Sequence, residues 1–176
     1  MEQVVLTVLL VSAFLEPSLW FIVPDLPLFF VLLAAPRRIA PVLISTIAAA
    51  TLGLLTAAAL LHVAPAEMAS LIERVPLVTP SMLQQLTSAP DLLERSLVQP
   101  WSRIPVKVWL LAAERQAVLA AIVPRLIVVR ALRMTMTAGM ALACAALFPR
   151  LLQRHYWLVV GVVSAVFAAV LWLTLP

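Results

Sequence analysis

Apolar runs of helix-spanning length dominate the chain, and its charged positions fall mainly between them. Two clean runs cover residues 39–63 and 156–175. At about 1.5 Å per residue, each can cross a hydrocarbon core of about 30 Å. A third run, residues 134–148, is too short alone and must extend back through Arg133 and Arg130. Because no run alternates apolar and polar positions like the strands of a barrel, the pattern predicts an all-α integral membrane protein with three to four transmembrane helices.

Composition supports an integral membrane protein. Of the 176 residues, 64% are hydrophobic and 11% charged, whereas roughly a quarter of the residues of a soluble domain are charged. No Lys or Arg precedes the first apolar run, so we expect no cleavable signal peptide there. The single Cys144 is expected to pack as a small apolar residue.

Polar residues between the runs predict topology. Acids and arginines alternate with Leu and Met over residues 64–98, which predicts amphipathic helices lying at a membrane interface. Arginines at 37, 38, 150 and 154 flank the apolar runs on what would be the opposite side. The positive-inside rule makes that arginine-rich side cytoplasmic.

Prolines and carboxylates interrupt two apolar segments in a related way. When "PDLPLFFVLLAAPRR" is aligned with "SRIPVKVWLLAAERQ", Pro27 falls on Pro105 and the two "LLAA" stretches coincide. Proline stops a helix, and irregular backbone at membrane depth is tolerated only where protein or a water-filled cavity covers it. We therefore expect two inverted re-entrant hairpins, at 14–36 and 99–113, whose tips at these prolines meet near the membrane centre.

The residues of these segments resemble a known family. "FLEPSLWFIVPDLPLFFVLLAAPRR" is similar to the first re-entrant signature of the DedA/VTT (SNARE-associated) membrane family, closest to its YqaA-like branch. "WSRIPVKVWLLAA" resembles the second signature, and "VVRALRM" resembles the arginine motif that follows it. The resemblance implies a DedA/VTT-like domain over 1–148, with 149–176 as an additional C-terminal transmembrane helix. It implies a protein of the bacterial inner membrane that translocates undecaprenyl phosphate or phospholipid with ion or proton coupling.

The resemblance also implies the candidate site. Its residues would be Glu16, Asp25, Lys107, Arg130 and Arg133. The two acids could line a functional cavity and carry a proton, or form fixed pairs with Arg103, Lys107 or Arg130. The spacing of three places Arg130 and Arg133 on one helix face, where they could clamp a lipid phosphate. Arg103 has no firm counterpart in the family and is a possible structural charge partner.

Other residue patterns exclude some classes of function. The sequence has no nucleophile constellation, no phosphate-binding glycine loop and no Cys/His cluster, so we expect neither an enzyme nor a metal or cofactor site. Its arginines flank membrane segments, so we expect membrane lipids rather than nucleic acid as partners. The five tryptophans, Trp109 among them, are expected to anchor helices at the interface, and Arg125 to extend toward it.

An alternative function remains open. The resembled family has glycine where this chain has Glu114 and Val129, and glycine allows the close backbone approach that mobile hairpins need. The chain could therefore be a non-transporting structural or assembly subunit of a larger membrane complex, or could associate with itself.

Overall fold

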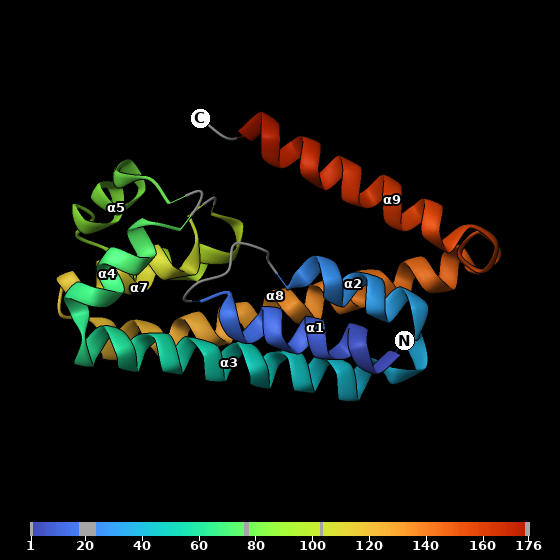
Figure 1. The fold of residues 1–176 in the computed structure, drawn as a ribbon, viewed down its shortest axis with the longest axis horizontal. Coiled ribbons are helices and arrows are strands. Elements are labelled where there is room, and N and C mark those ends of the chain that lie inside the picture. The colour runs from blue at the N-terminus through green and yellow to red at the C-terminus, as the bar shows by residue number, and fades with distance from the viewer. Residues whose placement is uncertain (1, 18–23, 76–77, 103, 175–176) are drawn as a thin grey trace.

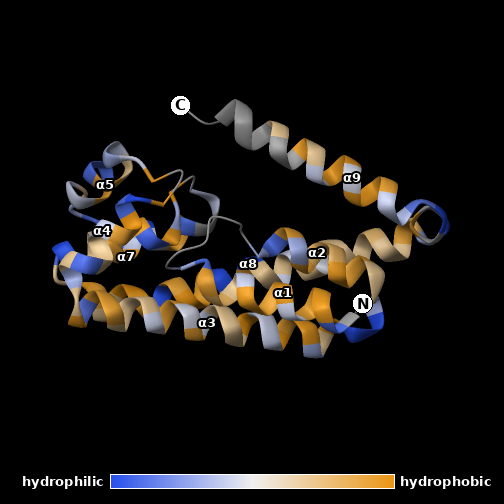
Figure 2. Cartoon of the chain, viewed as in Figure 1, coloured by the Kyte–Doolittle hydropathy of each residue, from blue (hydrophilic) through white to orange (hydrophobic). Residues whose placement is uncertain are grey.

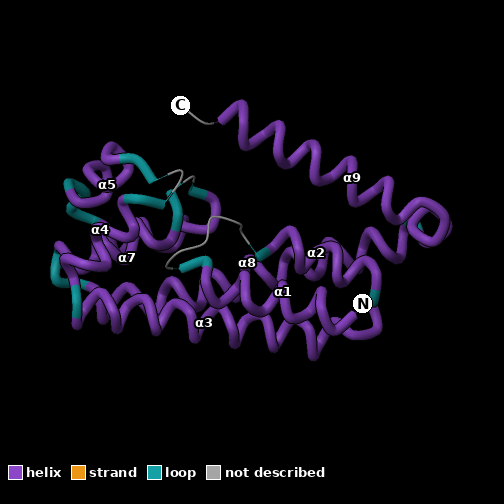
Figure 3. The backbone as a smooth tube through the Cα atoms, viewed as in Figure 1, coloured by secondary structure: helices purple, strands orange, loops and turns teal. Residues whose placement is uncertain are grey.

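The computed structural model describes residues 2–17, 24–75, 78–102 and 104–174. Every regular element in these ranges is helical, which confirms the all-α prediction (Figures 1 and 3). The elements are α1 (Glu2–Leu15), α2 (Asp25–Ala34), η1 (Pro36–Arg38), α3 (Ile39–Val63), α4 (Pro65–Glu73), α5 (Pro80–Thr87), α6 (Leu92–Arg95), η2 (Ser96–Trp101), α7 (Val106–Arg115), α8 (Leu119–Leu147) and α9 (Pro149–Thr174).

Two long helices, α3 and α8, form the base of the fold and pack against each other in opposite directions (Figure 1). The buried stripe of α3 has helical spacing and consists of Val42, Thr46, Ala50, Gly53, Leu54, Ala57, Ala58 and Leu61. Most of these side chains are small, so neighbouring helices can approach closely. α8 does extend back through Arg130 and Arg133 as predicted, and it begins at Leu119.

A short helix precedes each long helix. α2 and α7 both have ten residues, and each is followed by a brief connection into α3 or α8. Figure 1 shows α2 and α7 running outward in opposite directions, so that both begin near the middle of the long helices. In both aligned segments, a short helix is therefore followed by a long helix that runs in the opposite direction.

The prolines that were expected at the hairpin tips lie at the start of the short helices. Pro105 is the residue immediately before α7, and Pro27 is the third residue of α2, which follows Pro24. Both positions suit proline. The N–H groups of the first helical turn have no partner within the helix, so the N–H that proline lacks costs no hydrogen bond there. The predicted range 14–36 thus contains the end of α1, all of α2 and residues 18–23, which lie outside the described residues.

Four short helical elements occupy the segment predicted to be amphipathic. α4, α5, α6 and η2 follow one another between α3 and α7, and α5 buries Leu83 and Leu86 while Gln84 and Gln85 stay exposed. α7 is a central element of the fold. Each of its residues from Val106 to Ala113 is buried. Among these is Trp109, only 2% exposed. The prediction that Trp109 anchors the chain at an interface is therefore wrong.

Among the described residues, one helix is long and apolar enough to cross a membrane, Pro36–Val63. This is fewer than the three to four crossings predicted. α8 has the necessary length, but Arg125, Arg130 and Arg133 interrupt its apolar character. α9 changes direction at His155, where the backbone leaves the helical conformation.

Candidate functional site

A buried ion pair joins the end of α1 to the middle of α8. Glu16 follows the last residue of α1, where Pro17 prevents the helix from continuing. The Glu16 carboxylate accepts a hydrogen bond from Arg130 Nη2 at 2.6 Å. Both side chains are less than a tenth exposed. A buried pair of this kind tolerates the loss of one partner poorly, because the other charge is left uncompensated.

A second pair lies further along α8. Asp25 is the first residue of α2, and both of its carboxylate oxygens accept hydrogen bonds from Arg133. Thr137, one turn further along α8, donates its hydroxyl to Asp25 Oδ1 at 3.2 Å. The arginine therefore binds the carboxylate in the bidentate, fork-like geometry that it also uses for phosphate.

Lys107 adds a base from the second half of the chain. It is the second residue of α7 and is only 1% exposed. Its ammonium interacts electrostatically with both Glu16 and Arg130. The site thus combines three bases with two acids, a formal excess of one positive charge. The structure brings all five predicted site residues to the middle of the fold, whereas Arg103 lies outside the described residues.

The N-termini of both short helices lie at this cluster. Asp25 and Lys107 are each in the first turn of their helix. Free N–H groups and the helix dipole give a helix N-terminus a partial positive charge, which favours an anion nearby. In this conformation the Asp25 carboxylate supplies that anion for α2.

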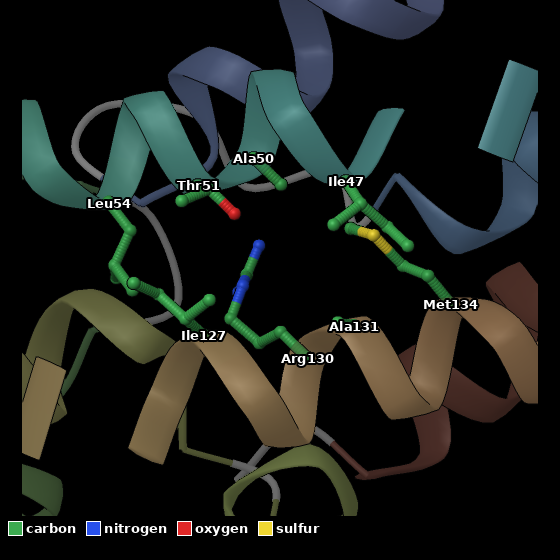
Figure 4. Close-up of a pocket in the computed structure, with 8 residues that line it drawn as sticks. All are labelled: Ile47, Ala50, Thr51, Leu54, Ile127, Arg130, Ala131 and Met134. Carbon is green, nitrogen blue, oxygen red and sulfur yellow. The ribbon is translucent and has the colours of Figure 1, made fainter. Parts of the chain in front are cut away.

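Little free space is left beside the Glu16–Arg130 pair. A void of about 10 Å³ lies between α3 and α8. In Figure 4, Arg130 extends from α8 toward α3, and the Thr51 hydroxyl points into the same space. A void of this size holds about one water molecule. The arginine is therefore closely surrounded here, with no space on this side for a lipid headgroup.

Sequence reasoning missed some polar members of the core. Thr137 gives no sequence signal beyond lying four residues after Arg133, on the same face of α8. Trp109 Nε1 and Gln99 Oε1 are buried without a hydrogen-bond partner among the described residues. Arg125, expected to extend to the interface, is exposed and donates a hydrogen bond to the carbonyl of Leu93 at 2.7 Å, which ties α8 to α6.

Chemically, this arrangement can exchange anions. A phosphate presents oxygen pairs much as a carboxylate does, so it can replace Asp25 or Glu16 on an arginine. In the described part of the chain, no group of His, Cys, Asp and Glu could hold a metal ion. Comparison with known protein families, with curated proteins and with solved structures finds no match to this chain.

Proposed function

We propose that this chain is a DedA/VTT-like protein of the bacterial inner membrane that translocates a phosphate-bearing lipid, undecaprenyl phosphate or a phospholipid, with ion or proton coupling. The observation that carries the proposal is the buried charge cluster, to which α2, α7, α8 and the residue that follows α1 each contribute. An ionisable group inside a membrane costs at least about 2.5 kcal/mol on insertion scales, so such a cluster indicates function.

The outer surface supports a membrane location. Large apolar side chains are exposed along three helices: Val4, Val8 and Val11 on α1, Ile44, Leu52 and Leu55 on α3, and Val128, Leu132, Met136 and Met140 on α8. Figure 2 shows the long helices apolar along most of their length. Continuous exposed apolar surface of this kind marks contact with lipid or with another protein.

Helix lengths support re-entrant hairpins. Ten residues of helix extend about 15 Å, half the thickness of a hydrocarbon core of about 30 Å. If α3 crosses the membrane, α2 and α7 therefore reach from opposite faces to its middle, where their N-termini and the charge cluster lie. Sites between interrupted helices at the midplane are typical of transporters with inverted repeats.

The ion pairs suggest how coupling works. A lipid phosphate binds Arg133 or Arg130 by taking the place of the carboxylate, and the displaced acid takes up one proton. When the lipid leaves on the other side, the acid releases its proton and pairs with the arginine again. Each transported phosphate thus exchanges for a carboxylate charge, and no arginine is left uncompensated in the membrane.

Neutralising the acids tests this function. We expect Glu16→Gln and Asp25→Asn to abolish lipid translocation in reconstituted vesicles, measured per amount of folded protein because each substitution leaves an arginine without its carboxylate. Glu73→Gln is the matched control, because Glu73 is an exposed acid that pairs with Arg115 at 3.2 Å outside the cluster. Full translocation by both cluster variants would contradict the proposed function.

The alternative is a structural subunit of a larger membrane complex. It is favoured by the closed state of the site, in which both acids are already paired and the adjoining void holds about one water molecule. In that case the wild type translocates no lipid and co-purifies in mild detergent with a fixed partner. A chain that migrates alone and moves lipid excludes this alternative.

A further inference from the structure

The two ion pairs of the charge cluster differ in how far the surroundings can reach them. The side chains of Arg130 and Glu16 are 6% and 8% exposed, whereas those of Arg133 and Asp25 are 23% and 18% exposed. The void beside Arg130 has room for only about one water molecule. An anion that arrives from outside the fold therefore meets Arg133 before it meets Arg130.

Three hydrogen-bond donors from one face of α8 converge on the Asp25 carboxylate. Arg133 donates from Nε to Oδ1 at 3.2 Å and from Nη2 to Oδ2. Thr137, four residues later, donates its hydroxyl to Oδ1 at 3.2 Å. A guanidinium fork with an added hydroxyl is also a suitable set of donors for the oxygens of a phosphate group.

The direction of the Thr137 hydroxyl differs from that of other threonines in the long helices. Thr46 and Thr56 of α3 and Thr135 of α8 each donate to the carbonyl oxygen four residues earlier, at 2.7–2.9 Å. This is the usual bond of a threonine inside a helix. The Thr137 hydroxyl donates across to α2, although Thr137 is only 8% exposed. It therefore points at the atom that an incoming phosphate oxygen would replace.

We propose that Arg133 and Thr137 form the entry site at which a lipid phosphate first displaces Asp25, with Thr137 as the residue that positions the phosphate. This inference rests on the proposed function and assigns an order to its steps. A phosphate oxygen takes over the hydrogen bond from Thr137, and the displaced Asp25 carboxylate takes up one proton. The phosphate then passes to Arg130, about 4.5 Å nearer the start of α8 and close to Lys107.

Inorganic phosphate tests the entry site without lipid transport. In full-length Asp25→Ala, three bases of the cluster face a single acid, so the vacated position attracts an anion. At ten times its Kd, phosphate should raise the melting temperature of this variant by about 3–6 °C over chloride at equal ionic strength. The matched controls are the wild type and Glu73→Ala, which breaks an exposed ion pair outside the cluster, and neither should show this difference.

The second ion pair and Thr137 provide two contrasts. Glu16→Ala should not respond to phosphate in this way, because its ion pair is less than a tenth exposed. In Asp25→Ala/Thr137→Val the Kd for phosphate should rise about tenfold, and Asp25→Ala/Thr137→Ser should keep the original Kd because it retains the hydroxyl. If Thr137 only held Asp25 in place, it would have no effect on phosphate once Asp25 is absent.

Several results would overturn the entry site. Equal melting temperatures of Asp25→Ala in the two salts would show that phosphate does not occupy the vacated position. Recovery of Asp25→Ala in neither salt would show that phosphate cannot replace the carboxylate, whereas recovery in phosphate alone supports the proposal. An equal response in Glu16→Ala, or an unchanged Kd in the Thr137→Val double variant, would contradict the order of binding or the role of Thr137.

Lipid transport by the wild type distinguishes this inference from the proposed function. If phosphate stabilises Asp25→Ala in a Thr137-dependent way but the wild type moves no lipid in vesicles, the anion site stands and the transport proposal fails. If the wild type moves lipid but phosphate never stabilises Asp25→Ala, the transport proposal stands and the entry site is wrong.

Discussion

A close contact between α3 and α1 makes Gly53→Ala a sharp test of the packing. A Cβ atom added at Gly53 of α3 would lie 2.0 Å from the backbone carbonyl oxygen of Phe14 in α1. Ordinary contact begins near 3.4 Å, so α1 and α3 must separate by more than about 1 Å. Because a backbone atom cannot rotate away as a side chain can, we expect destabilisation of about 1–3 kcal/mol, the usual cost of overpacking.

Gly139→Ala is the control for this substitution. Gly139 lies in α8 with nothing within 4 Å of the added Cβ, so only helix propensity changes there. Alanine is favoured over glycine by about 0.8–1 kcal/mol inside a helix, so Gly139→Ala should be neutral or slightly stabilising. Thermal unfolding of both variants in one detergent, followed by tryptophan fluorescence, measures the difference. Equal stability of the two variants would show that α1 does not pack on α3 as described.

Three further predictions concern the site, α9 and the topology. Thr137→Val removes the hydroxyl that donates to Asp25, and we expect about 1.5 kcal/mol less stability toward denaturant, a loss that Thr137→Ser should largely avoid. Tyr156→Phe removes the hydrogen bond between α9 and α2, and the melting temperature should fall by about 2–4 °C, corresponding to about 1 kcal/mol; no change would show that this bond does not hold α9. In a variant without the native cysteine, a cysteine at Ser88 should react with an impermeant thiol reagent from outside and one at Gln153 should not, and the reverse labelling would invert the predicted orientation.

The helical class and the long helices could be predicted because they depend on local pattern. The apolar run of residues 134–148 is too short to cross a bilayer, and that alone required α8 to include Arg130 and Arg133. The number of crossings was less accessible, because α8 has the length of a span while Arg125, Arg130 and Arg133 interrupt its apolar character.

The pairing of charges could not be read from the sequence in the same way. The sequence offered Arg103, Lys107 and Arg130 as partners of the two acids, and Asp25 instead pairs with Arg133. The pairing depends on how α1 and α2 dock on a helix more than 100 residues away. Thr137 was missed because a threonine inside a helix commonly bonds only to its own backbone. Trp109 was misplaced because a tryptophan near a segment end fits an interface anchor as well as a core residue.

The most direct test of the central claim is lipid translocation by a variant that loses both members of one buried pair. In Glu16→Gln/Arg130→Met neither member of the pair is left without the other, and Lys107 loses the repulsion of Arg130 together with the attraction of Glu16. Replacing a buried pair as a whole is often neutral for stability, so the protein should fold with normal abundance. If the pair binds and exchanges phosphate, this folded variant translocates no lipid in reconstituted vesicles. Translocation at the wild-type rate would show that Glu16 and Arg130 only hold the fold together and would contradict the account.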